Sequence, residues 1–252
     1  MYSLSPFNVA AMIAAGIAAG VLNVMAGGGS MFTLPVLMLL GLPASVANGT
    51  NRVAVLMQSV SGVYAFQKSG KLDSKAVLPV LLPTALGSLV GSFSASRLPE
   101  GLLKPILLGT MIAMATLLAL RPKAITAPAD AEPRSALSVG GFVGLFVAGL
   151  YGGFIQAGVG FILLSVFGGI LRYDLVRANA LKLTCTAIFG GVALLVFIQA
   201  GQVVWVPGLI LAAASVVGSI IGVRIAVRIP QAAIRWVVFA AVLLTCIGAY
   251  FK

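Results

Sequence analysis

Residues 20–51 read GVLNVMAGGGSMFTLPVLMLLGLPASVANGTN, and this stretch decides the fold. It is apolar apart from a run of glycines and a cluster of small polar side chains near its end. Glycines inside a helix destabilise it by about 1 kcal/mol each relative to alanine. They also release N–H groups that lipid cannot satisfy. The stretch therefore predicts a membrane helix that breaks at the glycines and is followed by a short apolar segment.

The composition of the whole chain predicts an all-α, polytopic membrane protein. Of its 252 residues, 60% are hydrophobic and 8% are charged, whereas a soluble domain carries about 25% charged residues. The first apolar run continues to about Met25 without a basic segment before it. It is therefore expected to be a retained membrane helix and not a cleaved signal peptide.

The charged residues and cysteines exclude several function classes. The chain has 16 basic and 5 acidic residues, but the basic residues fall between apolar runs, where they act as topology signals and not as a nucleic-acid surface. Histidine is absent, and Cys185 and Cys246 lie singly in apolar runs. No metal site, Ser-His-Asp enzyme or cofactor is therefore expected. Because no carboxylate lies in the middle of an apolar run, an anionic substrate is favoured over a cation.

A polar stretch divides the chain into two repeats. The predicted units are an N-terminal transmembrane repeat (1–120), an inter-repeat loop (121–136) and a C-terminal transmembrane repeat (137–252). Apolar runs lie at 7–25, 31–42, 44–66, 76–96, 101–120, 137–156, 159–171, 174–198, 203–226 and 231–251. The second and seventh runs are too short to span a bilayer comfortably, and each follows a glycine-rich turn. Short segments at matching places in two halves are typical of a transporter binding site.

A single constant shift along the chain aligns the two halves without a gap. The pattern GSxxGxxxAxRxP occurs at 87–99 and again at 218–230, and the shift that superimposes these two stretches also places Ala47-Asn48 on Ala178-Asn179. We refer to this displacement along the chain, which carries Gly87 onto Gly218, as the repeat shift. This common register indicates an internal duplication.

The basic loops predict that the two repeats have inverted topology. If the N-terminus is outside and every run crosses, twelve of the sixteen basic residues fall inside. The stretch 68–75 has three lysines, whereas its counterpart 199–206 has none. Inverted repeats explain this asymmetry. The number of true crossings stays open, because the first two runs could form a re-entrant hairpin without moving the later loops.

Two kinds of group are candidate anion ligands. The first is the backbone N–H groups at the glycine-rich breaks, where the alternative is tight helix packing. The second is the polar cluster at Asn48 and its counterpart at Asn179, where the alternatives are helix capping and snorkelling of Arg52. Lys182 lies deep in its run, where an unpaired charge is unfavourable. The predicted substrate-binding residues are Gly27, Gly28, Gly29, Ser30, Asn48, Thr50, Asn51, Arg52, Gln156, Gly158, Gly160, Asn179 and Lys182.

These motifs resemble the TauE/SafE family of bacterial membrane permeases, often called sulfite exporters. The resemblance rests on residues 20–51 and on GLYGGFIQAGVGFILLSVFGG (149–169), followed by LVRANALKLT (175–184). It implies a multi-pass protein of the bacterial inner membrane that moves sulfite or organosulfonates, usually outward. With the charge pattern, it places the N-terminus in the periplasm. The second half departs from the first, with Val166 where Pro35 stands.

We therefore expect a transporter, not an enzyme, for a small sulfur oxyanion or organosulfonate, with export as the expected direction. The expected partners are the small anion and membrane lipid. A homo-oligomer is compatible with the sequence, and no nucleic acid is expected. The alternatives are an uptake permease for another small anion and a non-transporting membrane subunit or scaffold. A membrane enzyme would need an acid/base pair that the apolar runs lack.

Overall fold

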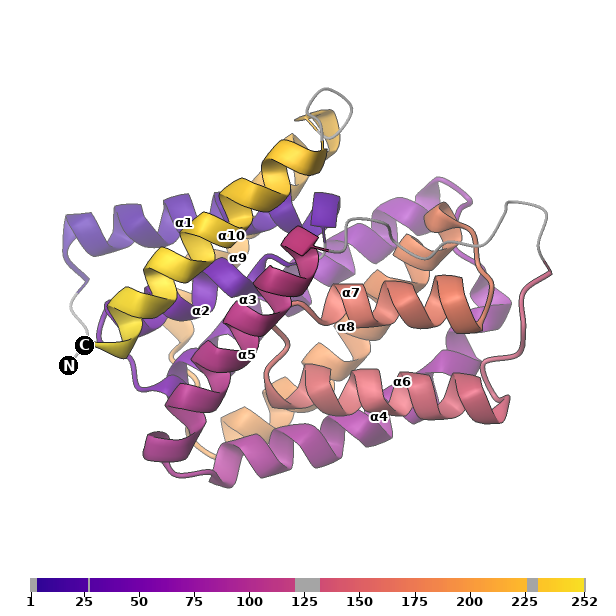
Figure 1. The fold of residues 1–252 in the computed structure, drawn as a ribbon, viewed down its shortest axis with the longest axis horizontal. Coiled ribbons are helices and arrows are strands. Elements are labelled where there is room, and N and C mark those ends of the chain that lie inside the picture. The colour runs from indigo at the N-terminus through magenta and orange to yellow at the C-terminus, as the bar shows by residue number, and fades with distance from the viewer. Residues whose placement is uncertain (1–3, 27, 121–131, 226–230, 252) are drawn as a thin grey trace.

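The computed structural model describes residues 4–26, 28–120, 132–225 and 231–251, and these contain helices but no strand (Figure 1). The helices are α1 (Pro6–Ala26), α2 (Ser30–Leu39), α3 (Ala44–Lys68), α4 (Ser74–Arg97), α5 (Glu100–Leu120), α6 (Val139–Phe154), α7 (Val159–Ser165), the π-helix η1 (Val166–Ile170), α8 (Leu175–Gln199), α9 (Trp205–Ile225) and α10 (Gln231–Tyr250). The predicted all-α fold is confirmed. Most of the predicted inter-repeat loop, 121–131, lies outside the described residues.

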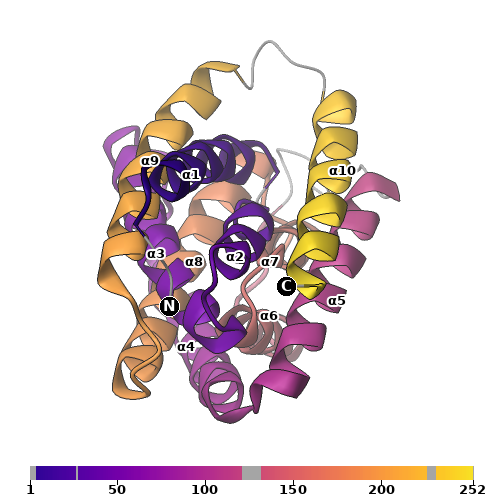
Figure 2. The same cartoon turned by 90° about the vertical axis from the view of Figure 1, so that its left-hand side faces the viewer.

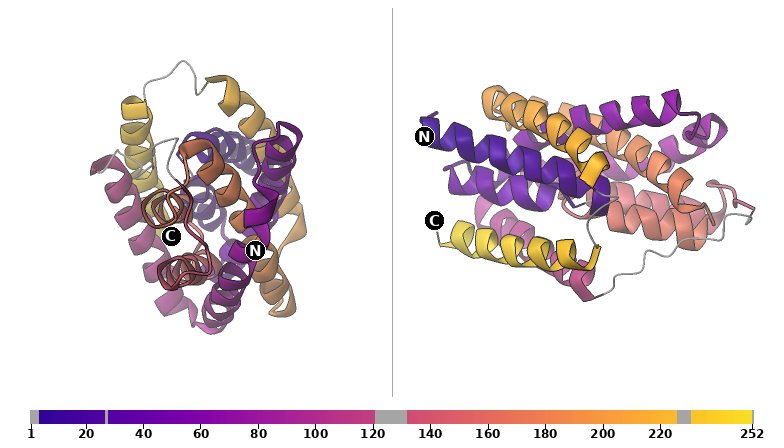
Figure 3. Two further views of the ribbon diagram at one scale, coloured as in Figure 1. Left: turned by 90° about the vertical axis from the view of Figure 1, so that its right-hand side faces the viewer. Right: turned by 90° about the horizontal axis from the view of Figure 1, so that it is seen from above.

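The described helices recur at the spacing of the repeat shift. This shift carries α3 onto α8 at both ends, Ala44 onto Leu175 and Lys68 onto Gln199. It also carries the starts of α4 and α5 onto those of α9 and α10. In the ribbon, α1 starts at the end of the bundle where the chain ends, whereas α6 starts at the opposite end (Figures 1 and 3). The boundaries of these helices therefore recur in the register in which the sequence pattern repeats.

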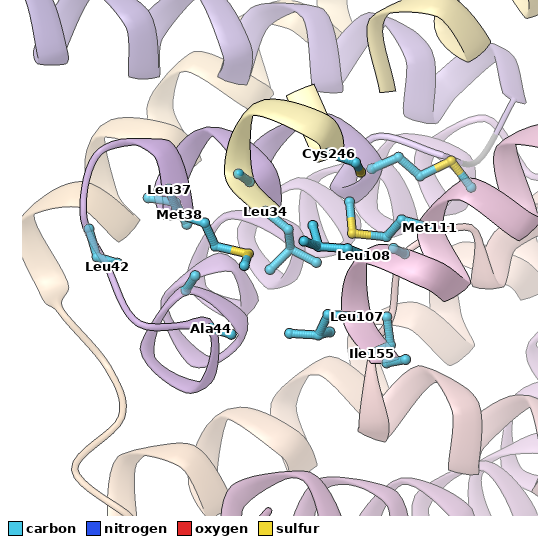
Figure 4. Packing of buried hydrophobic residues seen from close by; sticks show 14 of the residues in the cluster. Leu34, Leu37, Met38, Leu42, Ala44, Leu107, Leu108, Met111, Ile155 and Cys246 are labelled. Atoms are coloured by element: carbon cyan, nitrogen blue, oxygen red, sulfur yellow. The ribbon is translucent and has the colours of Figure 1, made fainter. Parts of the chain in front are cut away.

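The two halves of the chain are intertwined, because helices of each half pack against helices of the other. α1 packs along α9, and the equivalent pair, α6 and α4, packs in the same way. α3 contacts its counterpart α8, and α5 contacts its counterpart α10. Side chains of α2 such as Leu34 meet Leu108 and Met111 of α5 and Cys246 of α10 (Figure 4). The hydrophobic core is thus shared by both halves.

Glycines of the repeated GSxxG pattern lie where helices touch most closely. A Cβ atom on Gly87 would overlap the carbonyl oxygen of Phe146 in α6, and one on Gly218 would overlap that of Ile17 in α1. Neither position has room for any side chain. Small residues of this kind let helix backbones approach in membranes. This packing accounts for Gly87 and Gly218 in the repeated pattern.

The outer surface of the bundle suits lipid. Among the described residues, stretches of α1, α4, α5 and α8 are long and apolar enough to cross a membrane. Large apolar side chains face outward, with Leu78 74% exposed and Val139 83% exposed. α2 and α7 are shorter, as predicted, and α2 is buried along most of its length inside the longer helices (Figure 2). The chain is therefore a multi-pass membrane protein with two short internal helices.

Candidate functional site

A break separates the long first helix of each half from the short helix that follows it. In the first half the break contains Gly28 and Gly29; Gly27, also predicted as a ligand, lies outside the described residues. In the second half Gln156 and Gly158 have φ angles of +69° and +76°. This left-handed conformation is uncommon for glutamine and readily adopted by glycine. The glycine-rich stretches therefore do interrupt the helices, as the sequence predicts.

Tight turns lead into both short helices. Met31 donates its N–H to the carbonyl of Gly28 at 3.0 Å, and Phe161 donates to that of Gly158 at 3.0 Å. Ser30 and Gly160 are buried in the first turns of α2 and α7. First-turn N–H groups have no partner within their own helix. Both breaks therefore direct the positive ends of short helices into the protein.

The two breaks lie against each other. A Cβ atom on Gly158 would overlap the Cε atom of Met31, at the start of α2. A Cβ atom on Gly28 would stand 3.8 Å from Cε2 of Phe161, at the start of α7. The starts of α2 and α7, which belong to different halves of the sequence, are thus packed together.

Arg52 and Asn48 of α3 close the end of α6. The guanidinium of Arg52 donates to the carbonyls of Gly152 and Gly153, the latter at 2.8 Å, and to Oδ1 of Asn48 at 3.2 Å. Asn48 in turn donates from Nδ2 to the carbonyl of Phe154 at 2.8 Å. The last carbonyls of a helix need such donors, and a cation is favourable at that end of the helix dipole. Two residues of the first half therefore satisfy the backbone carbonyls that precede the break in the second half.

Arg52 has no acidic partner within the part of the chain that the structure describes. The side chain is fully buried, and its Cζ lies 5.4 Å from the ring centroid of Phe197. Among the described residues, the only ion pair joins Arg177 to Asp174 at the surface. Most of the guanidinium is nevertheless satisfied by carbonyls, and only its Nε atom lacks a partner.

Asn51 and Thr50 face different neighbours. Asn51 accepts a 2.5 Å hydrogen bond from the hydroxyl of Thr33 in α2, while its Nδ2 atom is buried without a partner. Thr50 accepts a 3.0 Å hydrogen bond from the N–H of Val204, just before α9. The hydroxyl of Thr50 thus anchors a loop of the second half, and Asn51 retains a free donor.

Lys182 of α8 is the second buried cation. Lys182 is only 3% exposed, and its Nζ atom donates to Oδ1 of Asn179 at 2.9 Å. The amide of Asn179 donates to the carbonyl of Leu175 in its own helix. The repeat shift places Lys182 on Asn51, so equivalent positions hold an ammonium and an amide with a free N–H.

Among the described residues, Gln156 at the second break has more buried side-chain polar atoms without a hydrogen-bond partner than any other. It is 2% exposed, and neither Oε1 nor Nε2 has a hydrogen-bond partner. Nε2 points toward α8, since it would lie 3.9 Å from a Cβ atom on Gly190. A buried polar group without a partner is rare in folded proteins and often marks a place for water or a ligand.

Sequence reasoning missed two residues that shape the first break. Gln58 of α3 donates to the carbonyl of Gly20 at 3.3 Å and accepts from the amide of Asn23 at 3.1 Å. Thr33 holds Asn51 in place. Each lies within an otherwise apolar run, Gln58 beside Ser59, and a polar side chain in such a run is the signal that could have identified them.

The buried charges of the described residues are all positive. The buried polar side chains of the described residues include Arg52 and Lys182 but no carboxylate. Glu100 instead accepts from the N–H groups of Ala44 and Ser45, each at 2.8 Å, at the start of α3. No group of residues that could hold a metal ion occurs within the described part of the chain. The interior is therefore suited chemically to an anion.

Comparison with known proteins gives consistent matches over nearly the whole chain. Residues 12–250 match the sequence profile of the family described as sulfite exporter TauE/SafE. A probable membrane transporter protein, ORF9, from Sinorhizobium sp. is 28% identical, with 90% of this chain and 86% of the relative aligned. A probable membrane transporter protein from Haemophilus influenzae is 26% identical over 90% of this chain and 88% of its own length. The probable membrane transporter protein YfcA of Escherichia coli K12 is 27% identical over 93% and 87%.

Proposed function

The chain belongs to the sulfite exporter TauE/SafE family of membrane transporters, and from this premise we propose that it carries a small sulfur oxyanion or organosulfonate outward across the bacterial inner membrane. Sulfite and sulfoacetate are the representative substrates. The family match supports transport, and the charges and unsatisfied donors of the interior support the choice of anion.

The observation that carries the proposal is the buried ammonium of Lys182. An ammonium has three N–H donors, and here one is used, by Asn179. A buried charge without a counter-ion is unfavourable by several kcal/mol. A bound anion would neutralise this charge in a region of low dielectric. Lys182 is therefore the proposed anchor of the substrate.

Neutral donors complete the proposed site. The amide nitrogens of Asn51 and Gln156 are buried and without partners, and the first turns of α2 and α7 add backbone N–H groups near Ser30 and Gly160. A sulfonate has three acceptor oxygens and no donor, so it matches a site that offers only N–H groups. We assign Asn48 and Arg52 to a supporting role, because their donors already hold the end of α6.

The proposed mechanism uses the duplication of the fold. The repeated helix boundaries and the opposite starting ends of α1 and α6 (Figure 1) support inverted repeats. In such transporters, broken helices meet near the midplane and one part of the bundle rocks against the other. We place the N-terminus in the periplasm because most basic loops then fall in the cytoplasm.

The test is counterflow by the purified chain in liposomes, with sulfite, sulfate, sulfoacetate, taurine and acetate as the panel. We expect exchange of sulfite or sulfoacetate by this chain alone, which a non-transporting subunit would not show. Asn48→Ala and Asn179→Ala should abolish exchange while the protein still reaches the membrane. Ser94→Ala, whose hydroxyl bonds only its own helix, serves as the control. Full exchange by both asparagine variants would reject the site.

A further inference from the structure

A hollow of about 750 Å³ opens at one end of the bundle, and none of the predicted substrate-binding residues is among its lining residues. It lies between the α3–α4 turn and the start of α8, and its lining includes Lys71, Asp73, Lys75, Asp174, Val176 and Arg177. We refer to it as the basic pocket. Residues 68–75 and 172–177 both carry several basic side chains, and here the fold brings the two segments together.

The acids of the basic pocket are already engaged. Asp73 accepts from the N–H of Lys75 at 3.1 Å and caps α4. Asp174 caps α8 by accepting from two N–H groups, and its second oxygen lies 3.4 Å from Nε of Arg177. Lys71 and Lys75 are exposed, and no carboxylate among the described residues pairs with either ammonium. Capping leaves both carboxylates charged, so the three basic and two acidic side chains that line the pocket carry a net charge of +1, and neither Lys71 nor Lys75 has an ion-pair partner among the described residues.

The basic pocket lies where the apolar surface of the bundle begins. Two of the candidate membrane spans start at Lys75 and Leu175, beside the pocket. The next outward-facing side chains are apolar, with Leu78 74% exposed and Val176 47% exposed. An apolar surface that ends at lysines corresponds to the boundary between acyl chains and lipid headgroups.

We propose that the basic pocket binds the phosphate of an anionic phospholipid headgroup, with Lys71 and Lys75 as its ligands. Clusters of basic residues at a membrane boundary attract anionic lipids, which are enriched in the cytoplasmic leaflet. The acyl chains would lie along the exposed apolar faces of α4 and α8. They hold the headgroup at high local concentration, an advantage that a free ion lacks. This site does not depend on which anion the protein transports.

The experiment is a titration of the detergent-purified full chain with phosphatidylglycerol or phosphatidylcholine, with bound lipid counted by native mass spectrometry. Each basic residue near an anionic surface strengthens binding about fivefold. K71Q/K75Q should therefore bind phosphatidylglycerol about thirtyfold more weakly, and K71R/K75R should bind it as the unmodified chain does. The matched control is R97Q/K104Q, which removes two charges near the α4–α5 turn, outside the pocket.

We expect phosphatidylglycerol to bind, phosphatidylcholine to bind far more weakly, and inorganic phosphate to fail to displace the lipid. Equal binding of the two lipids would overturn the proposal, as would equal loss in R97Q/K104Q. If inorganic phosphate bound as tightly as the lipid and displaced it, the pocket would be a site for a free anion instead.

Discussion

Lys182→Met should make the protein more stable and remove its response to anions. Methionine keeps an unbranched apolar stem of similar length but has no charge. The replaced ammonium is buried and has Asn179 as its hydrogen-bond partner, with no carboxylate nearby among the described residues. The substitution therefore removes an unneutralised charge and also removes the hydrogen bond to Asn179.

The structure allows the two effects to be compared. Loss of the 2.9 Å bond leaves Oδ1 of Asn179 unpaired, a loss of about 1 kcal/mol because that residue is only partly buried. Relief of an unpaired buried charge contributes several kcal/mol. The net gain is on the order of 2 kcal/mol. For a chain of this size that corresponds to an increase in apparent Tm of about 4–8 °C.

The assay is thermal unfolding of the purified protein in detergent, with and without sulfite. A ligand at 100 times its Kd stabilises a protein by about 2.7 kcal/mol, so the unmodified chain should show a clear increase in Tm with sulfite. Lys182→Met should start from a higher Tm and show no further increase.

Arg52→Met is the matched control, because it also replaces a buried cation by methionine. Arg52 donates to carbonyls of Gly152 and Gly153 and to Asn48, so its loss should destabilise the protein by about 3–5 kcal/mol. The two variants are thus expected to move Tm in opposite directions. A lower Tm for Lys182→Met, or an unchanged increase with sulfite, would refute the assignment of Lys182 as the unneutralised anchor.

Three further predictions concern residues outside the anchor. Gly87→Ala should lower Tm, because its Cβ would overlap a carbonyl of α6, whereas Gly109→Ala, with nothing within 4 Å, should raise it slightly. Thr50→Val should lower stability by about 1–2 kcal/mol through loss of the bond from Val204; flux per folded protein should persist, and its loss would place Thr50 at the substrate. Glu100→Gln should weaken the start of α3 by about 1 kcal/mol, and an unchanged unfolding midpoint would contradict this capping role.

Much of the fold could be predicted because its causes are local. Long apolar runs fix helices in lipid, and glycine runs such as 27–29 fix the breaks, since both depend on neighbouring residues. The predicted duplication rests partly on glycines whose helix contacts leave no room for a side chain, as at Gly87 and Gly218. These features require no knowledge of which helices meet.

The roles of the candidate site residues depended on distant partners. The sequence placed Arg52 and Asn48 in the site, but their bonding partners in α6 lie far along the chain, in the other half. Which polar group is satisfied and which remains free depends on such tertiary contacts. For the same reason the sequence predicts that both Thr50 and Asn51 bind substrate. In the structure, Thr50 accepts a hydrogen bond from a loop, whereas the amide nitrogen of Asn51 has no partner.

The exchange of helices between halves has a consequence for biosynthesis. α1 leaves the ribosome well before the helix it packs along, α9, which begins only at Trp205. Until then Gly16 and Gly20 of α1 lack the α9 backbone against which they pack. The nascent first half must therefore wait in the bilayer, or beside the insertion machinery, until α9 has been translated. Separately expressed halves would have to find each other in the membrane before either could become stable.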